Sequence, residues 1–420
     1  MIKKILTYAS GEVLVKGMVF LALPLYSHLI LPQEYGVLGF LNSLVAFLPF
    51  VLTFYYLYAY VRFSVDVEPS KLISTYFYLG IFLNIFYFLS ALIIYFLFIV
   101  NYEIELKYFI LSITASSSIF IFQILQMYYR SQGLAKKYIR MAVVYSIVGL
   151  SLNLILLLLL QDNILAMLLS GVITSILVSM VAFKILKKNI SWEQYDIVLV
   201  KKILKYTIPL VPGAISLLIF SQSDKLILIN YITKEELGVY NLAFTLGLSM
   251  AYIGSAFFMG YQPIFYEKIS KGLSDEIKEQ FNKNILLLVT ALLLSLSIIF
   301  IAYEFINIKY VNGIKFAFII AIAYSYIAFA QMMELHLTHI KKTFLVSIIY
   351  GVGAIVTLIS LYIFVPIYGA KGAAMSLFIS GFVISIIMYS MAQRNLYIEY
   401  SKFYLTVFYL ITCSLGVYFL

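Results

Sequence analysis

The sequence predicts an all-α integral membrane protein: a polytopic bundle of twelve transmembrane helices, with a thirteenth candidate near residue 420. Two observations support this prediction. Hydrophobic residues make up 63% of the 420 residues and charged residues only 11%, whereas soluble globular chains carry about 25% charged residues. The apolar residues also gather in continuous stretches of about 20, the length that a helix needs to cross roughly 30 Å of hydrocarbon.

These apolar stretches follow one another along the whole chain and are separated by short polar segments. Membrane-spanning β-strands would alternate apolar and polar residues over about 10 positions, and these stretches are uninterrupted, which favours helices. The candidate spans are 11–31, 36–61, 72–100, 107–128, 140–160, 163–184, 206–231, 238–262, 284–304, 314–337, 343–366 and 371–392. The thirteenth candidate covers 402–420.

Lysine and arginine are distributed unevenly between the two sides of this bundle. With the N-terminus in the cytoplasm, 22 of the 29 basic residues fall on the cytoplasmic side and five on the outer side. Cytoplasmic loops of membrane proteins carry such an excess, so we expect a cytoplasmic N-terminus. These cytoplasmic lysines and arginines account for the net charge of +10. Because the basic residues form no continuous stripe, we do not expect a nucleic acid as a partner.

Sequence motifs narrow the function classes further. Residues 1–4 precede an apolar stretch without a small-residue cleavage site, so we interpret that stretch as an uncleaved first span. The single cysteine, Cys413, allows neither a disulfide nor a cysteine-based metal site within one chain. The sequence contains no Walker A, HExxH or GxSxG motif, so we expect no transport driven by the chain's own ATP hydrolysis. Because the loops between the spans leave no room for a soluble catalytic domain, we also expect no enzymatic activity, and we expect no cofactor.

Two short motifs occur twice at nearly the same offset. Residues 3–8 (KKILTY) match residues 201–206 (KKILKY), and residues 34–37 (EYGV) match residues 236–239 (ELGV). The offsets are 198 and 202 residues. We interpret the pair as the trace of a duplication, with chance similarity in a biased composition as the alternative.

A duplication predicts three parts in this chain. The first is an N-terminal six-helix bundle over 1–200, the second a C-terminal six-helix bundle over 201–392, and the third a segment over 393–420 with cytoplasmic residues and the extra helix. Each bundle then begins in the cytoplasm. The repeat is therefore parallel, with its axis along the membrane normal, as in one class of transporters.

Ionisable residues inside a span are costly and usually face a cavity or a partner. Glu12 and Lys16 lie four residues apart in the first span and share a helix face. They either line a water-filled lumen, where Lys16 attracts an anion, or form a pair that reaches the cytoplasmic surface. In the seventh span, Asp224 is a candidate coupling or latch residue and Lys225 a candidate ligand of phosphate. The alternative for both is a structural bridge to another helix.

Three further groups of residues are candidates for function. Glu334 precedes His336 and His339 at the cytoplasmic end of the tenth span. This polar group either titrates and couples transport to an ion, or is the ordinary polar end of a helix. With three histidines in the chain, a metal site is not expected. Arg62 and Arg130 end the second and fourth spans. They are either bidentate ligands of phosphate or positive-inside anchors.

Aromatic residues and prolines mark two further segments. The run 54–60 (FYYLYAY) offers rings that stack on sugars, with an interfacial aromatic belt as the alternative. Pro209 and Pro212 each remove a hydrogen bond from the seventh span. They make that span a candidate kinked gate.

Several motifs resemble those of one known family. They are 31–37 (LPQEYGV), 129–133 (YRSQG), 204–212 (LKYTIPLVP), 224–225 (DK), 236–240 (ELGVY) and 368–374 (YGAKGAA). In this order they resemble polysaccharide flippases of the Wzx type, in the MOP exporter superfamily that also contains the MATE transporters. That family often has Asp-Arg where this chain has Asp224-Lys225, which keeps the charge but loses the bidentate fork of arginine.

The resemblance implies a MATE-like fold of two bundles around a central cavity. It implies a flippase in the bacterial cytoplasmic membrane that moves polyprenyl-diphosphate-linked oligosaccharides across by alternating access, for surface polysaccharides such as O-antigen. Lys16 and Lys225 in the cavity would suit the diphosphate. The implied partners are this lipid-linked oligosaccharide, membrane lipids, H⁺ or Na⁺ as a coupling ion, and a polysaccharide polymerase with glycosyltransferases.

Two other functions compete with this interpretation. The first is a cation-coupled antiporter of small molecules or drugs, as in MATE transporters. The second is a membrane-embedded polysaccharide polymerase or ligase, which generally needs a long outer loop with convergent polar groups. No predicted outer loop exceeds about ten residues. The loop motifs favour the flippase over the antiporter.

Overall fold

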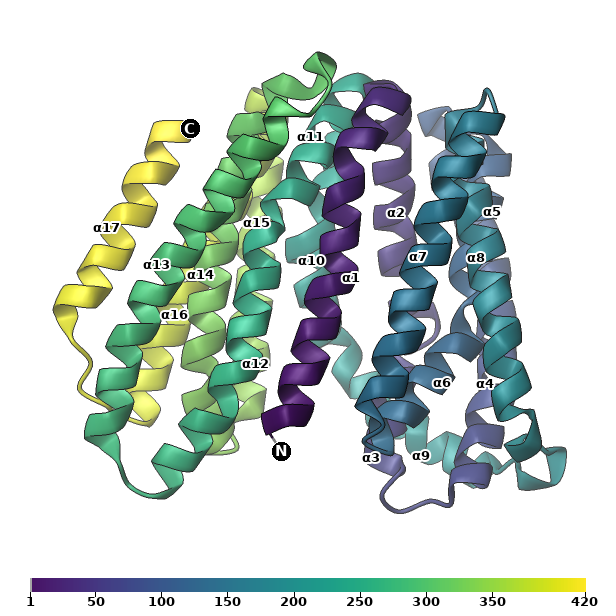
Figure 1. The fold of residues 1–420 in the computed structure, drawn as a ribbon, viewed down its shortest axis with the longest axis horizontal. Helices are drawn as coiled ribbons and strands as arrows, with labels where there is room; N and C mark the ends of the chain where they lie inside the picture. Colours follow the sequence, from purple (N-terminus) through teal and green to yellow (C-terminus); the bar gives the residue numbers. More distant parts are fainter. Residues whose placement is uncertain (1) are drawn as a thin grey trace. The chain divides into compact units, whose positions relative to one another are not determined.

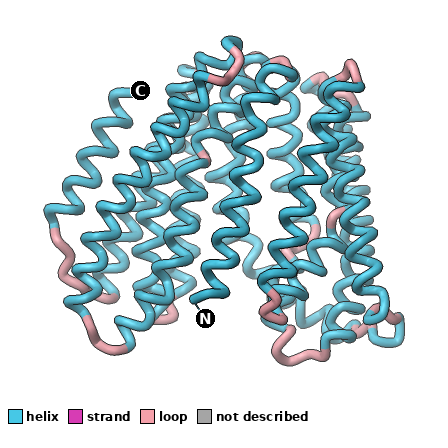
Figure 2. The backbone as a smooth tube through the Cα atoms, viewed as in Figure 1, coloured by secondary structure: helices cyan, strands magenta, loops and turns pink. Residues whose placement is uncertain are grey.

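The computed structural model describes residues 2–420, and it describes side chains for 15–258, 260–273 and 275–420. The described chain is helical almost throughout and contains no strand (Figures 1 and 2). Within it, twelve helices are long and apolar enough to cross a membrane. These findings confirm the predicted all-α, multi-pass membrane fold.

The helices follow the predicted spans closely. In chain order they are α1 (Ile2–Leu29), α2 (Pro32–Leu52), α3 (Tyr60–Phe63), α4 (Pro69–Ile94), α5 (Leu106–Ser118), α6 (Phe120–Ser131), α7 (Ala135–Leu159), α8 (Asn163–Leu186), α9 (Ile197–Thr207), α10 (Val211–Leu228), α11 (Lys234–Gly247), α12 (Ser249–Ser270), α13 (Ser274–Glu304), α14 (Ile314–His339), α15 (Thr343–Tyr368), α16 (Ala370–Asn395) and α17 (Lys402–Phe419). The thirteenth candidate, now α17, is among the helices long enough to span. Among the residues whose side chains are described, α1 is apolar over Val15–Leu29.

The chain forms two compact units that differ from the predicted division at residue 200. Unit 1 contains residues 1–36 and 219–420, and unit 2 contains residues 37–218. Helix α1 belongs to unit 1, because the Tyr310 hydroxyl donates to the Ile30 carbonyl (2.9 Å) and the Asn307 N–H donates to Ser27 Oγ (3.1 Å). Contacts of this kind cannot be read from hydropathy, which shows where a helix lies in the chain but not what it packs against.

Unit 1 contains the close contact that explains one of the repeated motifs. A methyl group at Gly36 would overlap the Lys234 carbonyl, and one at Gly238 would overlap the Pro32 carbonyl. The two glycines, which occupy the same place in residues 34–37 and 236–239, therefore face each other where α2 and α11 begin. The Asn241 side chain donates to the Tyr35 carbonyl (3.3 Å) at the same crossing.

The glutamates of the two motifs start these helices. Glu34 accepts a hydrogen bond from the Leu31 N–H at 2.8 Å. Glu236 accepts one from the Thr233 N–H at 3.2 Å, and Thr233 Oγ1 accepts from the Glu236 N–H, which forms a capping box. A capping box satisfies two N–H groups that a helix start otherwise leaves unpaired. The glutamate and the glycine of the repeated motif thus each have a structural reason.

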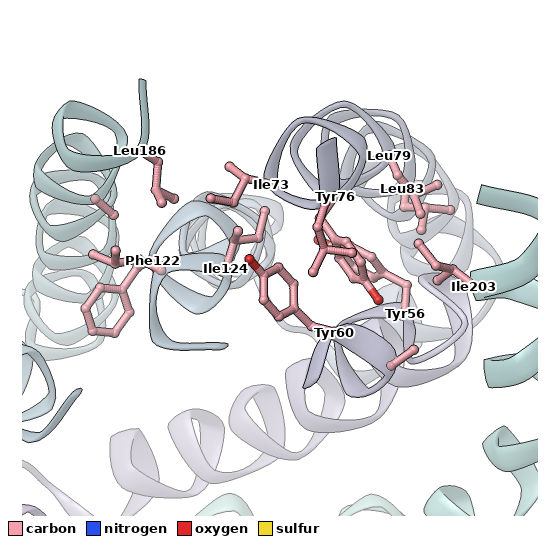
Figure 3. Close-up of a cluster of buried hydrophobic side chains, with 14 of the residues drawn as sticks. Tyr56, Tyr60, Ile73, Tyr76, Leu79, Leu83, Phe122, Ile124, Leu186 and Ile203 are labelled. Atoms are coloured by element: carbon pink, nitrogen blue, oxygen red, sulfur yellow. The ribbon is translucent and has the colours of Figure 1, made fainter. Parts of the chain in front are cut away.

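Unit 2 is built around a buried cluster that joins α3, α4, α6, α8 and α9 (Figure 3). Tyr56, Tyr60 and Tyr76 form its centre, with Tyr60 and Tyr76 ring centroids 4.8 Å apart. Ile203 reaches the cluster from α9. This packing holds the segment after α2 in place, and that segment lines the candidate site.

Candidate functional site

A cavity of about 680 Å³ opens in unit 2. Its walls come from the end of α2, the turn that follows, α3, α6 and one residue of α9. The lining residues are Pro49, Phe50, Thr53, Tyr55, Tyr56, Leu57, Tyr58, Val61, Arg62, Gln123, Gln126, Met127, Arg130 and Tyr206. All of them lie in residues 37–218, so the cavity is a property of one unit.

The cavity exists because the chain changes direction after α2. Phe54 and Tyr55 adopt the left-handed conformation, with φ of 54° and 52°. Bulky residues rarely adopt this conformation, and such a residue costs about 1–3 kcal/mol. The buried side chains of Tyr56 and Tyr60, in and after the 3₁₀ turn Tyr56–Ala59, offset that cost by packing into the core. The turn brings α3 and its Arg62 back beside α2.

Three aromatic rings form a ladder on one wall of the cavity. Phe50 stacks on Tyr55 with ring centroids 4.9 Å apart, and Tyr55 stacks on Tyr58 at 4.8 Å. The Tyr58 side chain is the most open of the three, with 54% of its surface exposed. The face of an aromatic ring carries partial negative charge, which attracts the C–H groups on the face of a sugar ring.

Helix α6 supplies a polar stripe to the cavity. Gln123, Gln126 and Arg130 lie three and four residues apart and therefore share a helix face. The neighbouring face carries Phe122 and Leu125, which are buried in the core cluster. The two amides offer donors and acceptors to hydroxyl groups, so this wall complements the aromatic ladder chemically.

Arg62 and Arg130 are the two charged residues among those that line the cavity. Arg62 pairs with Asp66, with Nη1 and Oδ2 2.5 Å apart, but each side chain is 56% exposed. Exposed pairs of this kind contribute about 0–1 kcal/mol, so Arg62 remains available to a ligand. No carboxylate lines the cavity, and its net charge is positive. The two predicted phosphate ligands, which are 68 residues apart in the chain, thus lie in one cavity.

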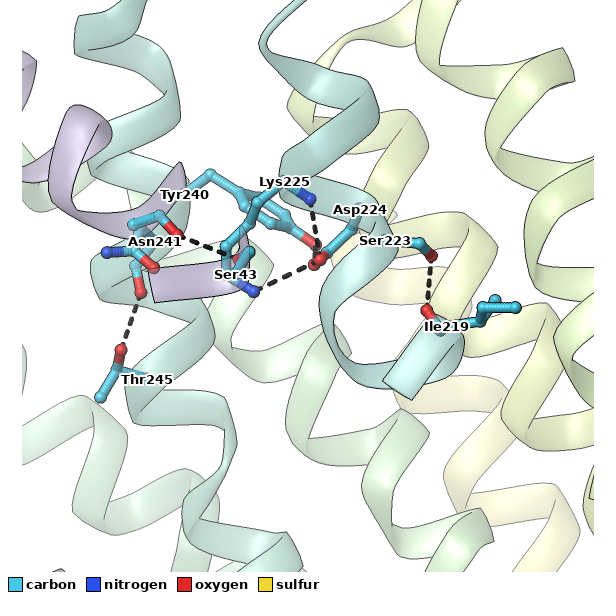
Figure 4. A network of polar contacts seen from close by, with 9 residues as sticks. Ser43, Ile219, Ser223, Asp224, Lys225, Tyr240, Asn241 and Thr245 are labelled. Atoms are coloured by element: carbon cyan, nitrogen blue, oxygen red, sulfur yellow. Dashed lines mark hydrogen bonds and ion pairs between the residues drawn. The ribbon is translucent and has the colours of Figure 1, made fainter. Parts of the chain in front are cut away.

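The predicted residues Asp224 and Lys225 form a buried pair in unit 1 (Figure 4). The Lys225 ammonium lies 3.3 Å from Asp224 Oδ1 and 3.4 Å from the centroid of the Phe244 ring. The Tyr240 hydroxyl donates to Asp224 Oδ2 at 2.7 Å. The long side chain of Lys225 thus folds back onto the neighbouring carboxylate, and its role as a ligand of phosphate stays a prediction.

We expect Lys225→Met to destabilise unit 1 strongly. Removal of one partner leaves the fully buried Asp224 carboxylate without its cation, a change that typically costs about 3–5 kcal/mol. The thermal unfolding temperature of the purified variant in detergent measures this loss. The double variant Asp224→Asn with Lys225→Met removes both charges and should recover most of the stability. An unfolding temperature equal to that of the wild type in Lys225→Met would contradict the pairing.

The remaining predicted charges lie in two other parts of unit 1. The Lys16 ammonium lies 4.4 Å from the centroid of the Tyr252 ring, so α1 and α12 share a cation–π contact there. The side chain of Glu12 lies outside the described residues. Glu334 accepts a hydrogen bond from the Tyr350 hydroxyl at 2.9 Å.

The two histidines of α14 do not act together. His336 is buried, with Nε2 2.6 Å from the Tyr400 hydroxyl and Nδ1 3.1 Å from the Met333 carbonyl. His339 stacks instead on the Tyr266 ring, with centroids 6.1 Å apart. His336 therefore has a structural role at this end of unit 1.

The two prolines of the predicted gate lie where one helix passes into the next. Pro209 is in the 3₁₀ turn Ile208–Leu210, and Pro212 is the second residue of α10. Proline is tolerated in the first turn of a helix, where its missing N–H has no partner to lose. The break between α9 and α10 is as expected, and the role as a gate stays a prediction.

Sequence reasoning missed Gln123, Gln126 and Tyr206 as residues of the site. The signal for the two glutamines was present, because they share the face of Arg130 on a helix whose other residues are mostly apolar. No comparable signal existed for Tyr206. It lines the cavity only because α9 packs its Ile203 into the core of unit 2.

Comparisons with known proteins agree with this architecture. The model of a family described as polysaccharide biosynthesis protein matches residues 1–267. The structure of the lipid II flippase MurJ in an inward closed conformation aligns at a TM-score of 0.70 and 15% identity, over 98% of this chain and 97% of that one. A multidrug resistance MATE family transporter of the MOP superfamily in an outward-facing conformation aligns at 0.65 and 15% identity, over 94% and 95%.

A third structure, a MOP superfamily transporter from Pyrococcus furiosus, aligns at a TM-score of 0.58 and 13% identity, over 94% of this chain and 95% of that one. At these identities the likeness establishes the fold. A comparison with curated proteins gives no match. The family match confirms the resemblance inferred from the loop motifs, and the structural matches confirm the predicted MATE-like fold.

Proposed function

The chain belongs to the polysaccharide biosynthesis protein family, and we propose that it is a flippase for polyprenyl-diphosphate-linked oligosaccharides. It is a multi-pass membrane protein with the fold that a lipid II flippase and MATE transporters share. We place it in the bacterial cytoplasmic membrane with a cytoplasmic N-terminus, on the distribution of its basic residues. In this proposal it moves its substrate to the outer leaflet by alternating access and catalyses no covalent step.

The observation that supports this function best is the composition of the cavity. Arg62 and Arg130 provide two planar guanidinium groups, which bind phosphate oxygens in bidentate fashion. The ladder of Phe50, Tyr55 and Tyr58 offers ring faces to sugars. A diphosphate cannot leave water for an apolar environment without such partners, since burying unpaired charges costs tens of kcal/mol.

The size of the cavity suits the headgroup of this substrate and not its lipid. A volume of about 680 Å³ lies within the range of about 300–1,000 Å³ that is typical of small-molecule sites. A polyprenyl chain is wholly apolar and stays in the bilayer without cost. We therefore propose that the diphosphate and the first sugars enter the cavity while the lipid remains in the membrane.

We also propose roles for the predicted charged residues and prolines that do not line the cavity. Asp224 and Lys225, joined to Tyr240, act as a latch within unit 1, and Pro209 and Pro212 as the gate between α9 and α10. Lys16 remains a proposed contact of the substrate, with Glu12 as its proposed partner. The proposed partners in the pathway are a polysaccharide polymerase and glycosyltransferases, which use and supply the lipid-linked sugar.

We propose that Glu334 couples translocation to protons. Its carboxylate is partly buried in α14, and among the described side chains its hydrogen bond comes from Tyr350. Among the described residues no ion pair involves Glu334, so we propose its carboxylate as the group that takes up the coupling proton, with Na⁺ as the alternative coupling ion. The coupling free energy between two binding sites in a protein is typically about 1–3 kcal/mol.

Glu334→Gln is therefore expected to make translocation insensitive to a proton gradient. In proteoliposomes, a gradient should change the rate of the wild-type protein by about 5-fold or more, and the variant should translocate at one rate with or without it. Glu304→Gln, a change at an exposed carboxylate at the end of α13, is the matched control. A full response of Glu334→Gln to the gradient would remove this residue from the coupling.

The MATE-like fold raises the alternative of a drug antiporter. Organic cations need acidic or purely aromatic sites, and this cavity has two arginines and no carboxylate in its lining. The positive charge therefore favours an anionic substrate over a cationic drug. A polymerase or ligase remains the least favoured function, for lack of a long outer loop.

A leaflet-translocation assay in proteoliposomes tests the proposed function. A fluorescent polyprenyl-diphosphate-linked oligosaccharide is reconstituted with the protein, and its accessibility to a membrane-impermeant quencher is followed. We expect protein-dependent movement of this lipid and no uptake of ethidium. Uptake of ethidium without movement of the lipid would favour the antiporter and overturn the proposal.

A further inference from the structure

One basic surface of unit 2 is not used by the proposed function. Six lysines lie between the end of α8 and the end of α9, and all six are exposed: Lys184, Lys187, Lys188, Lys201, Lys202 and Lys205. We refer to residues 184–208 as the basic segment. Within the described part of the chain, no ion pair involves any of these six lysines. The segment therefore presents uncompensated positive charge.

Large apolar side chains are exposed beside these lysines. Trp192, the single tryptophan of the chain, is 67% exposed, and its ring stacks on Tyr195 with centroids 5.2 Å apart. Ile197 and Val198 are more than half exposed in the first turn of α9. Tryptophan favours the level of the lipid headgroups, where its ring is apolar on its faces and donates a hydrogen bond at its edge.

The basic segment is held firmly against unit 2. Ser74 Oγ donates to the Asn189 carbonyl (2.9 Å) and accepts from the Ser191 N–H (3.0 Å). Lys71 pairs with Asp196 at 2.7 Å, and Asp196 also caps the start of α9 by accepting from the Val198 N–H. The segment is thus an ordered surface and not a loose loop.

The face of α9 that meets the core is distinct from the face that carries the charge. Leu199 and Ile203, four residues apart, are buried in the core cluster, whereas Lys201 and Lys205 lie on the exposed side. Within unit 2, Figure 1 shows α9 lying across the ends of the long helices. A basic, amphipathic helix in this position is typical of a segment that lies in the membrane interface.

We propose that the basic segment binds the headgroups of acidic phospholipids. The lysines carry the positive charge that complements anionic headgroups. Trp192, Ile197 and Val198 provide the apolar contacts with the acyl-chain boundary. This lipid contact is independent of the proposed substrate, because Tyr206 is the one residue of the segment that lines the cavity, and neither the six lysines nor Trp192 does.

Trp192 also makes the experiment possible, because it is the single tryptophan of the chain and therefore the source of its tryptophan fluorescence. The protein is reconstituted in nanodiscs that contain phosphatidylglycerol and phosphatidylcholine, and either one lipid or the other is brominated in its acyl chains at the same mole fraction. Bromine quenches tryptophan only on contact. We expect brominated phosphatidylglycerol to quench Trp192 about twofold or more strongly than brominated phosphatidylcholine at low salt.

Two further measurements show whether the lysines cause this preference. Both lipids should quench Trp192 equally in a fivefold variant, K187Q, K188Q, K201Q, K202Q, K205Q. The control variant K271Q with K283Q changes exposed lysines of unit 1 and should keep the preference for phosphatidylglycerol. If the fivefold variant does not fold, the wild type itself is measured in rising salt, which screens the charges and should remove the preference.

Equal quenching of wild-type Trp192 by the two lipids at low salt would overturn the proposal. The lysines would then serve only to orient the chain in the membrane. A preference for phosphatidylglycerol that survives both high salt and the fivefold variant would also overturn it, because charge would not be the cause. Neither result bears on the flippase assay, so the two proposals fail separately.

Discussion

Gly238→Ala is expected to abolish the folded protein. The added methyl group would overlap the Pro32 carbonyl, and its counterpart at Gly36 would overlap the Lys234 carbonyl. A backbone carbonyl cannot rotate away as a side chain can, so α2 and α11 would have to separate where they cross. Overpacking typically costs about 1–3 kcal/mol and occasionally more; we expect about 3 kcal/mol or more here, because the obstacle is backbone.

Fluorescence-detected gel filtration of membrane extracts measures this effect. The Gly238→Ala and Gly36→Ala variants should run as aggregates or fail to accumulate. Gly260→Ala is the matched control, because it also lies inside a helix and nothing lies within 4 Å of its added methyl group. It should behave as the wild type or be slightly more stable. A monodisperse Gly238→Ala protein with wild-type unfolding temperature would contradict the close crossing.

The double variant Arg62→Gln with Arg130→Gln is expected to lower translocation of the lipid-linked oligosaccharide by 100-fold or more. A hydrogen bond to a charged group contributes about 1.5–3 kcal/mol, and two such losses add to at least about 3 kcal/mol if the arginines bind one diphosphate. Each single variant should lose about tenfold. The loss should be greatest at low substrate concentration, where binding limits the rate.

The control for this experiment is Arg140→Gln. Arg140 is an exposed arginine of unit 2 that lies on α7 and does not line the cavity. The Arg140→Gln variant should translocate the lipid-linked oligosaccharide at the wild-type rate, because we expect Arg140 only to anchor the chain at the membrane surface. If the double variant kept half of the wild-type rate or more, Arg62 and Arg130 would be anchors as well.

The membrane fold could be predicted because each span carries its own signal. A helix such as α15 is apolar throughout, and its neighbours are separated by short polar segments, so hydropathy alone locates it. The repeated EYGV and ELGV motifs also predicted a relationship between two parts of the chain. That Gly36 and Gly238 contact each other could not be predicted, because a repeat indicates common structure and says nothing of mutual packing.

Of the residues that line the cavity, Arg62 and Arg130 were candidate ligands in the sequence, but the geometry that places them together could not be predicted. Arg62 and Arg130 were candidates for phosphate, yet they meet only because the chain turns at Phe54 and Tyr55. Glycine or asparagine usually marks a left-handed turn, and two aromatic residues give no such signal. For Lys225, the alternative to a phosphate ligand was a bridge to another helix, whereas its flexible side chain pairs with the neighbouring Asp224.

Photo-crosslinking tests the central claim, that the cavity of unit 2 holds the sugar diphosphate. A polyprenyl-diphosphate-linked oligosaccharide with a diazirine on its first sugar is reconstituted with the protein and irradiated, and the labelled peptides are identified by mass spectrometry. We expect the label on Tyr55, Tyr58 or Gln126, with competition by the unlabelled lipid. A label confined to residues 219–420, with none on the cavity, would contradict the account.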